Sequence, residues 1–183
     1  MTRLFDILFS FLGLVILSPV LIVLTIIGYF DTGSPVFHQE RVGKGKKPFR
    51  VIKFRSMHVN APSVATHLSS ASVITPFGCF LRKSKLDELP QLWNVLVGDM
   101  SLVGPRPNLY NQEELIHERN SRGVYSVRPG ITGLAQINKI DMSTPQLLAE
   151  TDARMIQELN TLGYFKYIVL TVFGKGFGDR IKQ

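Results

Sequence analysis

The sequence predicts a mostly helical α+β protein that is attached to a membrane through its N-terminal segment. Residues 7–30 carry no charged side chain, and a helix of this length can cross a bilayer core of about 30 Å. Residues 49–54 alternate apolar and basic side chains, as one strand of a short β-hairpin does. Apolar side chains recur at helical spacing in residues 87–97 and 144–160.

Length, charge and cysteine content limit the classes of protein to which this chain can belong. Its 183 residues suffice for one domain with a hydrophobic core. The net charge of +7 lies entirely in residues 31–183, because residues 1–30 hold one base and one acid, which indicates anionic partners. Cys79 is the single cysteine, which excludes an intramolecular disulfide. The four histidines are too scattered for a zinc pattern, so no structural metal site is predicted.

The apolar N-terminal segment is interrupted at its centre by Ser18-Pro19. Proline removes a helix hydrogen bond and predicts a kink, and the Ser18 hydroxyl can bond the carbonyl that is left over. The kinked helix either spans the membrane or enters and leaves on the same face. Because only Arg3 precedes it among basic residues, both topologies keep the basic body in the cytoplasm. Asp6 and the length of the apolar segment disfavour a cleaved signal peptide.

A basic segment follows the turn at residues 33–35. Its seven cations, with no acid among them, are Arg41, Lys44, Lys46, Lys47, Arg50, Lys53 and Arg55. One interpretation is a solvated hairpin that lies on anionic headgroups. Nucleic-acid binding is the other, but no aromatic stacking platform or known binding module accompanies the cations. Residues 43–46 also lack the spacing of a nucleotide-binding P-loop.

Two adjacent carboxylates, Asp87 and Glu88, stand at the head of the helical segment 87–97. Pro90 is tolerated only in a first helical turn, which predicts a helix start near Asp87. A carboxylate at that end of a helix is favoured in its ionised form and could act as a nucleophile. The plainer alternative is that Asp87 caps the helix and Glu88 is a solvated acid.

Cations surround this pair in the sequence. Arg82, Lys83 and Lys85 precede it, and Arg106 lies between Pro105 and Pro107, which stiffen its backbone. Carboxylates among fixed cations suit a site for phosphates and a divalent metal. Arg106 on its own is better interpreted as a surface arginine in a proline-rich turn.

These residues carry a resemblance to a known family. The run SKLDELPQLWNVLVGDMSLVGPRP (residues 84–107) resembles the signature of bacterial phosphoglycosyl transferases, the polyprenol-phosphate sugar-phosphate transferases. Residues 33–57 and the RPGITGLAQ run at 128–136 are also similar to that family. The resemblance implies a monotopic membrane protein with residues 1–30 as a re-entrant helix kinked at Ser18-Pro19. Residues 31–183 are then the cytosolic catalytic domain, with a short β-hairpin.

The resemblance also implies an activity at the bacterial inner (cytoplasmic) membrane, with the catalytic domain on the cytoplasmic face. Such enzymes move a sugar-1-phosphate from a UDP-sugar to polyprenyl (undecaprenyl) phosphate and release UMP, which starts a surface glycan. The sugar class implied is an N-acetylated hexosamine or a deoxy derivative. Asp87 would form a covalent aspartyl-phosphosugar, Glu88 would assist it, and Mg2+ would be held by Asp87 or Glu88.

The family motifs further imply residues that bind substrate. They are Lys53, Arg82, Arg106, Pro107, Arg128, Gln136 and Asp152. After the RPGITGLAQ motif, the family often continues with Asn-Gly-Arg, whose arginine is associated with a nucleotide contact. This chain has Asn138-Lys139-Ile140 at that place, so Lys139 is a candidate to replace the arginine. Residues 134–138 are expected to be strand-like, and the small polar residues 60–72 a loop.

The C-terminal third predicts further helices. Residues 108–122 suggest a surface helix, and Thr144-Pro145 begin one that ends near residue 160. Asp152 lies on the apolar side of that helix, which suggests a partner such as Arg106, Lys53 or a metal. Residues 164–177 are either an interfacial helix or a core helix that packs on the body.

Two alternatives to the two-step enzyme remain open from the sequence. The chain could be a non-catalytic, membrane-anchored basic adaptor, in which Asp87 is dispensable. It could also transfer the phosphosugar directly in one step, with Glu88 as general base and no covalent intermediate. Among partners, we expect membrane lipid, the UDP-sugar and the polyprenyl phosphate, and no nucleic acid.

Overall fold

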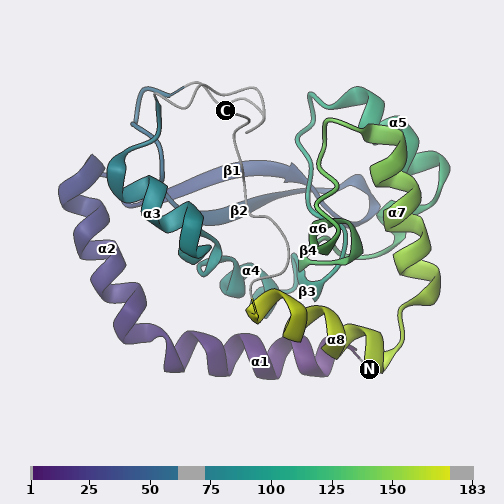
Figure 1. The fold of residues 1–183 in the computed structure, drawn as a ribbon, viewed down its shortest axis with the longest axis horizontal. Helices are drawn as coiled ribbons and strands as arrows, with labels where there is room; N and C mark the ends of the chain where they lie inside the picture. Colours follow the sequence, from purple (N-terminus) through teal and green to yellow (C-terminus); the bar gives the residue numbers. More distant parts are fainter. Residues whose placement is uncertain (1, 62–72, 174–183) are drawn as a thin grey trace.

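The computed structural model describes residues 2–61 and 73–173, which form a mostly helical α+β protein with two small sheets (Figure 1). This confirms the mostly helical α+β class, and the membrane attachment stays a prediction. The elements in chain order are α1 (Thr2–Ile16), α2 (Ser18–Thr32), β1 (Val36–Val42), η1 (Lys44–Lys46), β2 (Pro48–Phe54), α3 (Pro76–Ser84), η4 (Leu86–Glu88), α4 (Gln91–Val97), β3 (Ser101–Val103), α5 (Glu113–Ser121), η5 (Val124–Ser126), β4 (Gly130–Thr132), α6 (Leu134–Ile137), α7 (Pro145–Glu158) and α8 (Thr161–Val172).

The N-terminal helix bends at Ser18-Pro19, as predicted. Helices α1 and α2 meet at 63°, and the Ser18 hydroxyl donates to the Val15 carbonyl at 2.8 Å. That carbonyl would accept from residue 19 in an unbroken helix, but proline has no N–H. In the described part of the chain, no single helix is long and apolar enough to cross a membrane, whereas α1 and α2 together have the length and composition to do so.

Strands β1 and β2 form the predicted antiparallel hairpin, in which Val36 lies opposite Phe54 and Val42 opposite Pro48. Gly45 turns the chain between them with a positive φ of 63°, which glycine adopts without strain. A second sheet was not predicted: β3 and β4 pair in parallel, with Ser101 opposite Gly130. A Cβ atom on Gly130 would lie 2.0 Å from the Gly104 nitrogen, so this close approach requires glycine.

The predicted helix start near Asp87 is wrong, and Pro90 explains the difference. Residues 86–88 form the 3-10 turn η4, and the α-helix begins only at Gln91. Pro90 has no N–H to donate to the Leu86 carbonyl, and the Leu89 N–H bonds that carbonyl at 3.2 Å instead. The two carboxylates therefore lie in a tight turn that leads into α4.

Other boundaries follow the sequence more closely. Helix α7 confirms the helix predicted for 144–160, and α5 is a shorter form of the one predicted for 108–122. The strand expected at 134–138 is wrong, because residues 134–137 form the short helix α6. The predicted loop at 60–72 and the end of the predicted helix 164–177 lie largely outside the described residues.

Helix α8 packs on the body, in agreement with the core-helix alternative, and the interfacial alternative stays a prediction. It lies beside α1 (Figure 1), where the Phe5 and Phe165 rings are 5.0 Å apart. Tyr164 is fully buried in the main hydrophobic core with Val95 and Met100. Its other side leaves apolar residues exposed, and these are Leu162, Val169 and Val172.

Candidate active site

The centre of the candidate site is the Glu88 carboxylate. Arg106 Nη2 donates to Glu88 Oε1 at 2.6 Å, and Lys53 Nζ lies 3.8 Å from the same oxygen. The three side chains come from different parts of the chain: η4, the turn after β3, and strand β2. All three are at least four-fifths buried, where charge-assisted hydrogen bonds are stronger than in water.

Asp87 and Glu88 are both buried, with 3% and 8% of their surfaces exposed. Glu88 is therefore not the solvated acid of the plainer alternative. The Asp87 side chain does not cap the helix either, since α4 begins after Pro90 without a side-chain cap. A buried pair of adjacent carboxylates is unusual unless cations or a metal face it.

A buried asparagine holds this turn against the hairpin. Asn94 on α4 donates from Nδ2 to the Arg50 carbonyl at 2.8 Å and accepts from the Ile52 N–H at 3.0 Å. It pairs with the edge of β2 as a neighbouring strand would. Lys53, the residue after Ile52, is thereby set opposite Glu88.

Four other predicted site residues, Arg82, Pro107, Arg128 and Gln136, form hydrogen bonds with neighbouring residues. Arg82 Nε donates to Ser56 Oγ at 2.8 Å, and the Pro107 carbonyl accepts from Arg41 at 3.3 Å. Arg128 Nε bonds the Gly98 carbonyl at 2.7 Å, and Gln136 Nε2 bonds the Gly104 carbonyl at 3.2 Å. In the described part of the chain, the structure brings Lys53, Glu88 and Arg106 together and gives Arg128 and Gln136 contacts with loop backbone.

Asp152 is fully buried as expected, and its partner is Arg119 on α5 rather than Arg106 or Lys53. Arg119 Nη2 donates to Asp152 Oδ2 at 2.7 Å and Nε donates at 3.1 Å. Burial raises the pKa of the Asp152 carboxyl, and the adjacent guanidinium opposes that shift. Sequence reasoning missed Arg119, which looks like an ordinary charge on a polar surface helix.

Asn94 and Asn108 were missed for a similar reason. Both are buried, at 2% and 0% exposure, and both satisfy backbone or side-chain partners within the frame. The available signal was an amide side chain within an apolar run, at Asn94 between Trp93 and Val95. Such a residue requires buried hydrogen-bond partners.

The described residues include no group of three or more His, Cys, Asp or Glu side chains that could form a metal site. Mg2+ is commonly held by only one or two carboxylates together with waters and substrate phosphates. The adjacent Asp87 and Glu88 carboxylates fit that smaller requirement.

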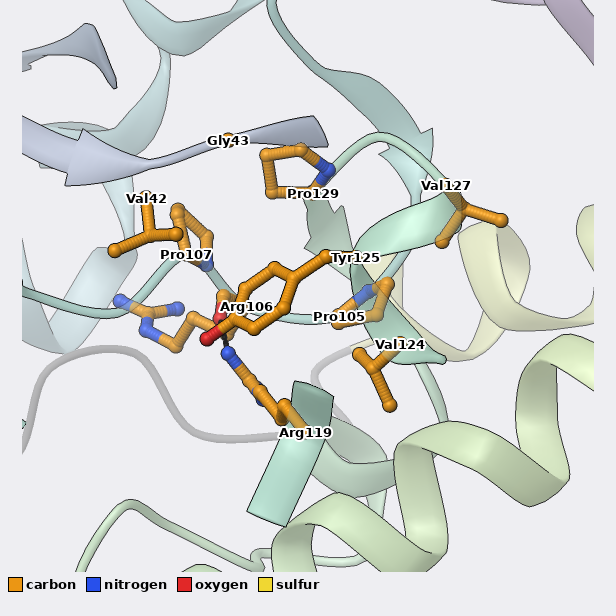
Figure 2. Close-up of a pocket in the computed structure, with 10 residues that line it drawn as sticks. All are labelled: Val42, Gly43, Pro105, Arg106, Pro107, Arg119, Val124, Tyr125, Val127 and Pro129. Atoms are coloured by element: carbon orange, nitrogen blue, oxygen red, sulfur yellow. Dashed lines mark hydrogen bonds between the residues drawn. The ribbon is translucent and has the colours of Figure 1, made fainter. Parts of the chain in front are cut away.

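A small hollow lies on the main-chain side of Arg106. It is lined by prolines, by Tyr125 and by Arg119, together with residues at the end of β1 (Figure 2). Arg119 points to the Arg106 carbonyl, whereas the Arg106 guanidinium points away from it. Burial raises the pKa of the Tyr125 hydroxyl, which donates to Asn108 Oδ1 at 3.0 Å.

Comparison with known proteins gives the same assignment across almost the whole chain. The family described as "Bacterial sugar transferase" matches residues 1–176. A Klebsiella pneumoniae protein named UDP-glucose:undecaprenyl-phosphate glucose-1-phosphate transferase is 42% identical over 96% of this chain and 40% of its own length. The Rhizobium leguminosarum bv. phaseoli exopolysaccharide production protein PSS is 38% identical over 91% of this chain and 88% of its own.

A third relative differs in its named sugar. The galactosyl transferase CpsE of Streptococcus agalactiae is 36% identical over 93% of this chain and 41% of its own length. The chain therefore spans about two fifths of the Klebsiella and Streptococcus relatives and most of the Rhizobium one. Relatives that are similar to this chain at this level are therefore named for different sugars.

Proposed function

Because this chain belongs to the bacterial sugar transferase family, we propose that it transfers a sugar-1-phosphate from a UDP-sugar to undecaprenyl phosphate and releases UMP. The observation that carries the proposal is the buried Asp87-Glu88 pair with Arg106 and Lys53 on Glu88. It supports the proposal because the residue next to the candidate nucleophile Asp87 holds two cations suited to a diphosphate. The relative named for exopolysaccharide production supports a role in starting a surface glycan.

The proposed reaction has two displacement steps. An Asp87 carboxylate oxygen attacks the β-phosphorus of the donor, and the bond from that phosphorus to the bridging oxygen breaks, so that UMP leaves with the electron pair. A phosphate oxygen of the acceptor then attacks the same phosphorus in the aspartyl-phosphosugar. The acyl-phosphate bond breaks, and the Asp87 carboxylate is restored.

Glu88 and its cations have separate roles in this proposal. Glu88 holds Arg106 and Lys53 in place before substrate arrives, since both contact its Oε1 atom. The cations then face the phosphate oxygens on which negative charge develops. Asp87 and Glu88 would hold Mg2+, which when bound would neutralise diphosphate charge.

We further propose that α1 and α2 form a re-entrant hairpin in the cytoplasmic membrane, with the body on the cytoplasmic face. Large apolar side chains point outward along both helices, among them Leu4, Phe11, Ile16, Ile22 and Phe30. A continuous exposed apolar surface of this size is typical of a lipid-facing segment. A body seated there brings a soluble donor and a lipid phosphate to one site.

The proposal is tested with purified protein in detergent, Mg2+ and a panel of UDP-sugars, without acceptor. We expect UMP release and an intact mass raised by one phosphosugar, and neither in Asp87→Asn. The panel compares N-acetylated hexosamines and their deoxy derivatives, implied by the family resemblance, with glucose and galactose, which appear in relatives' names.

The other outcomes separate the remaining alternatives. UMP that appears only after polyprenyl phosphate is added, with no adduct, would favour direct transfer with Glu88 as base. Full function of Asp87→Asn in cells would favour the non-catalytic adaptor. Because Asp87→Asn keeps the side-chain volume almost unchanged, a melting temperature equal to that of the unmodified protein would show that the loss is chemical.

A further inference from the structure

Arg119 is a fully buried arginine, and its N–H groups donate to residues that support the candidate site. It is 1% exposed, and its Nε and Nη2 atoms bond Asp152 Oδ2 at 3.1 and 2.7 Å. Burying a guanidinium is costly unless it is paired and hydrogen-bonded. The Asp152 carboxylate supplies that charge, and the third nitrogen, Nη1, is left for other acceptors.

Arg119 Nη1 connects two points of the proline-rich turn. It donates to the Arg106 carbonyl at 2.9 Å (Figure 2). It also donates to Asn108 Oδ1 at 2.9 Å, on the other side of Pro107. The Tyr125 hydroxyl donates to the same Asn108 oxygen at 3.0 Å. The main chain of Arg106 is therefore fixed from behind by a buried cation.

The other side of the same residue forms the site, because Arg106 Nη2 bonds Glu88 Oε1 at 2.6 Å. Pro105 and Pro107 restrict the φ angles of the turn, and the Pro105 carbonyl accepts from the Gly130 N–H at 2.8 Å. With these restraints, the direction of the Arg106 side chain depends on where Arg119 holds its carbonyl.

We propose that Arg119 is a positioning residue for the transfer reaction. It holds the Arg106 backbone so that the guanidinium meets Glu88 and, with substrate bound, a phosphate oxygen of the donor. This inference rests on the proposed function, since it assigns Arg119 a role through a residue of that site. In this proposal, Asp152 is the counter-charge of Arg119 and does not bind substrate.

The test is a double-mutant cycle on the single-turnover rate of adduct formation. Arg119→Lys keeps a positive charge for Asp152, but an ammonium group does not reproduce the fork that reaches Asp152, Arg106 and Asn108 together. We expect the rate to fall by about ten- to a hundredfold, which is the effect of a misplaced catalytic group. In an Arg106→Ala background, Arg119→Lys should slow the reaction no further, because no guanidinium remains to be positioned.

Arg122→Lys is the matched control. Arg122 also lies at the end of α5 and joins it to α7 through Glu150 at 3.2 Å, but its ion pairs are with Glu118 and Glu150. A rate close to that of the unmodified protein is expected. Asn108→Ala serves if Arg119→Lys does not fold. It removes one acceptor while the Arg119–Asp152 pair stays, and its effect should also vanish with Arg106→Ala.

A second readout does not depend on the reaction. Amide hydrogen exchange of residues 106–110 should accelerate in Arg119→Lys and stay unchanged in Arg122→Lys. Equal slowing of adduct formation in both Arg106 backgrounds, or unchanged exchange in this segment, would overturn the positioning role. Absence of any adduct in the unmodified protein would instead refute the two-step mechanism under "Proposed function", and the exchange result would still decide the role of Arg119.

Discussion

At the scale of single residues, Asn94 shows how one side chain sets the geometry of the candidate site. Its amide occupies the place of a neighbouring strand, with one bond to the Arg50 carbonyl and one from the Ile52 N–H. Because Asn94 lies on the helix that follows Asp87 and Glu88, the same two bonds fix the distance between Glu88 and Lys53. An apolar residue of similar size would fill the space but leave the β2 edge unpaired.

Asn94→Ala should therefore destabilise the protein by about 1–3 kcal/mol, since it removes the partner of the Ile52 N–H and of the Arg50 carbonyl in two partly buried hydrogen bonds. The measurement is denaturant unfolding in detergent, followed by tryptophan fluorescence, because Trp93 is the single tryptophan and the adjacent residue. Asn120→Ala is the control, as Asn120 is exposed at the end of α5. A loss no larger than that of the control would show that Asn94 does not hold the hairpin.

At the scale of elements, the bend between α1 and α2 bears on the proposed membrane topology. An unbroken helix over residues 2–32 would be about 45 Å long at 1.5 Å per residue, more than enough to span a bilayer. The 63° bend and the Ser18 bond to Val15 favour a hairpin that returns to the same face. The two topologies differ in the side on which Thr2 lies.

Thr2→Cys in a Cys79→Ser background tests this topology. With a membrane-impermeant maleimide, we expect labelling of Thr2→Cys only after the membrane is opened, because a re-entrant helix keeps residue 2 in the cytoplasm. Adding Pro19→Ala restores an N–H for the Val15 carbonyl and should allow labelling from outside. Ser18→Ala, which keeps the proline, is the control. Outside labelling of Thr2→Cys with Pro19 intact would establish a spanning helix.

At the scale of the whole molecule, α1 from the expected membrane segment packs directly into the expected cytosolic domain. Buried Asp6 on α1 accepts hydrogen bonds from Ser101 Oγ, the Leu102 N–H and the Tyr164 hydroxyl at 3.0, 2.9 and 2.7 Å. Burial and the Asp6 bond both raise the pKa of Tyr164, so its hydroxyl stays a donor at neutral pH. Arg3 bonds the Val95 and Leu96 carbonyls at the end of α4.

Substitutions in this contact should give graded losses of stability. Asp6→Ala leaves three buried donors unpaired and should cost about 3 kcal/mol or more, whereas Tyr164→Phe removes one bond and should cost about 1 kcal/mol. Thr25→Ala on exposed α2 should cost almost nothing, because its hydroxyl bonds only the Leu21 carbonyl of its own helix. The free energy of unfolding in detergent is the quantity measured. Equal stability of Asp6→Ala and Thr25→Ala would show that α1 is merely attached.

The parts of the fold that the sequence predicted are those set by local rules. The β1–β2 hairpin follows from alternation around glycines, and the α1–α2 bend follows from one proline. The parallel pairing of β3 with β4 was missed because three-residue strands carry no periodicity and their partners are 29 residues apart. Arg119 and Asp152 were not paired in advance for the same reason: their burial depends on how α5 packs against α7.

The Asp6–Tyr164 bond joins residues 158 positions apart, and it has a consequence for folding. Bringing such distant residues together costs loop-closure entropy, which must be offset by the contacts formed between them. The Asp6 carboxylate on α1 therefore gains its Tyr164 partner only when α8 packs against α1, and we expect this contact to form after the local elements, such as the β1–β2 hairpin.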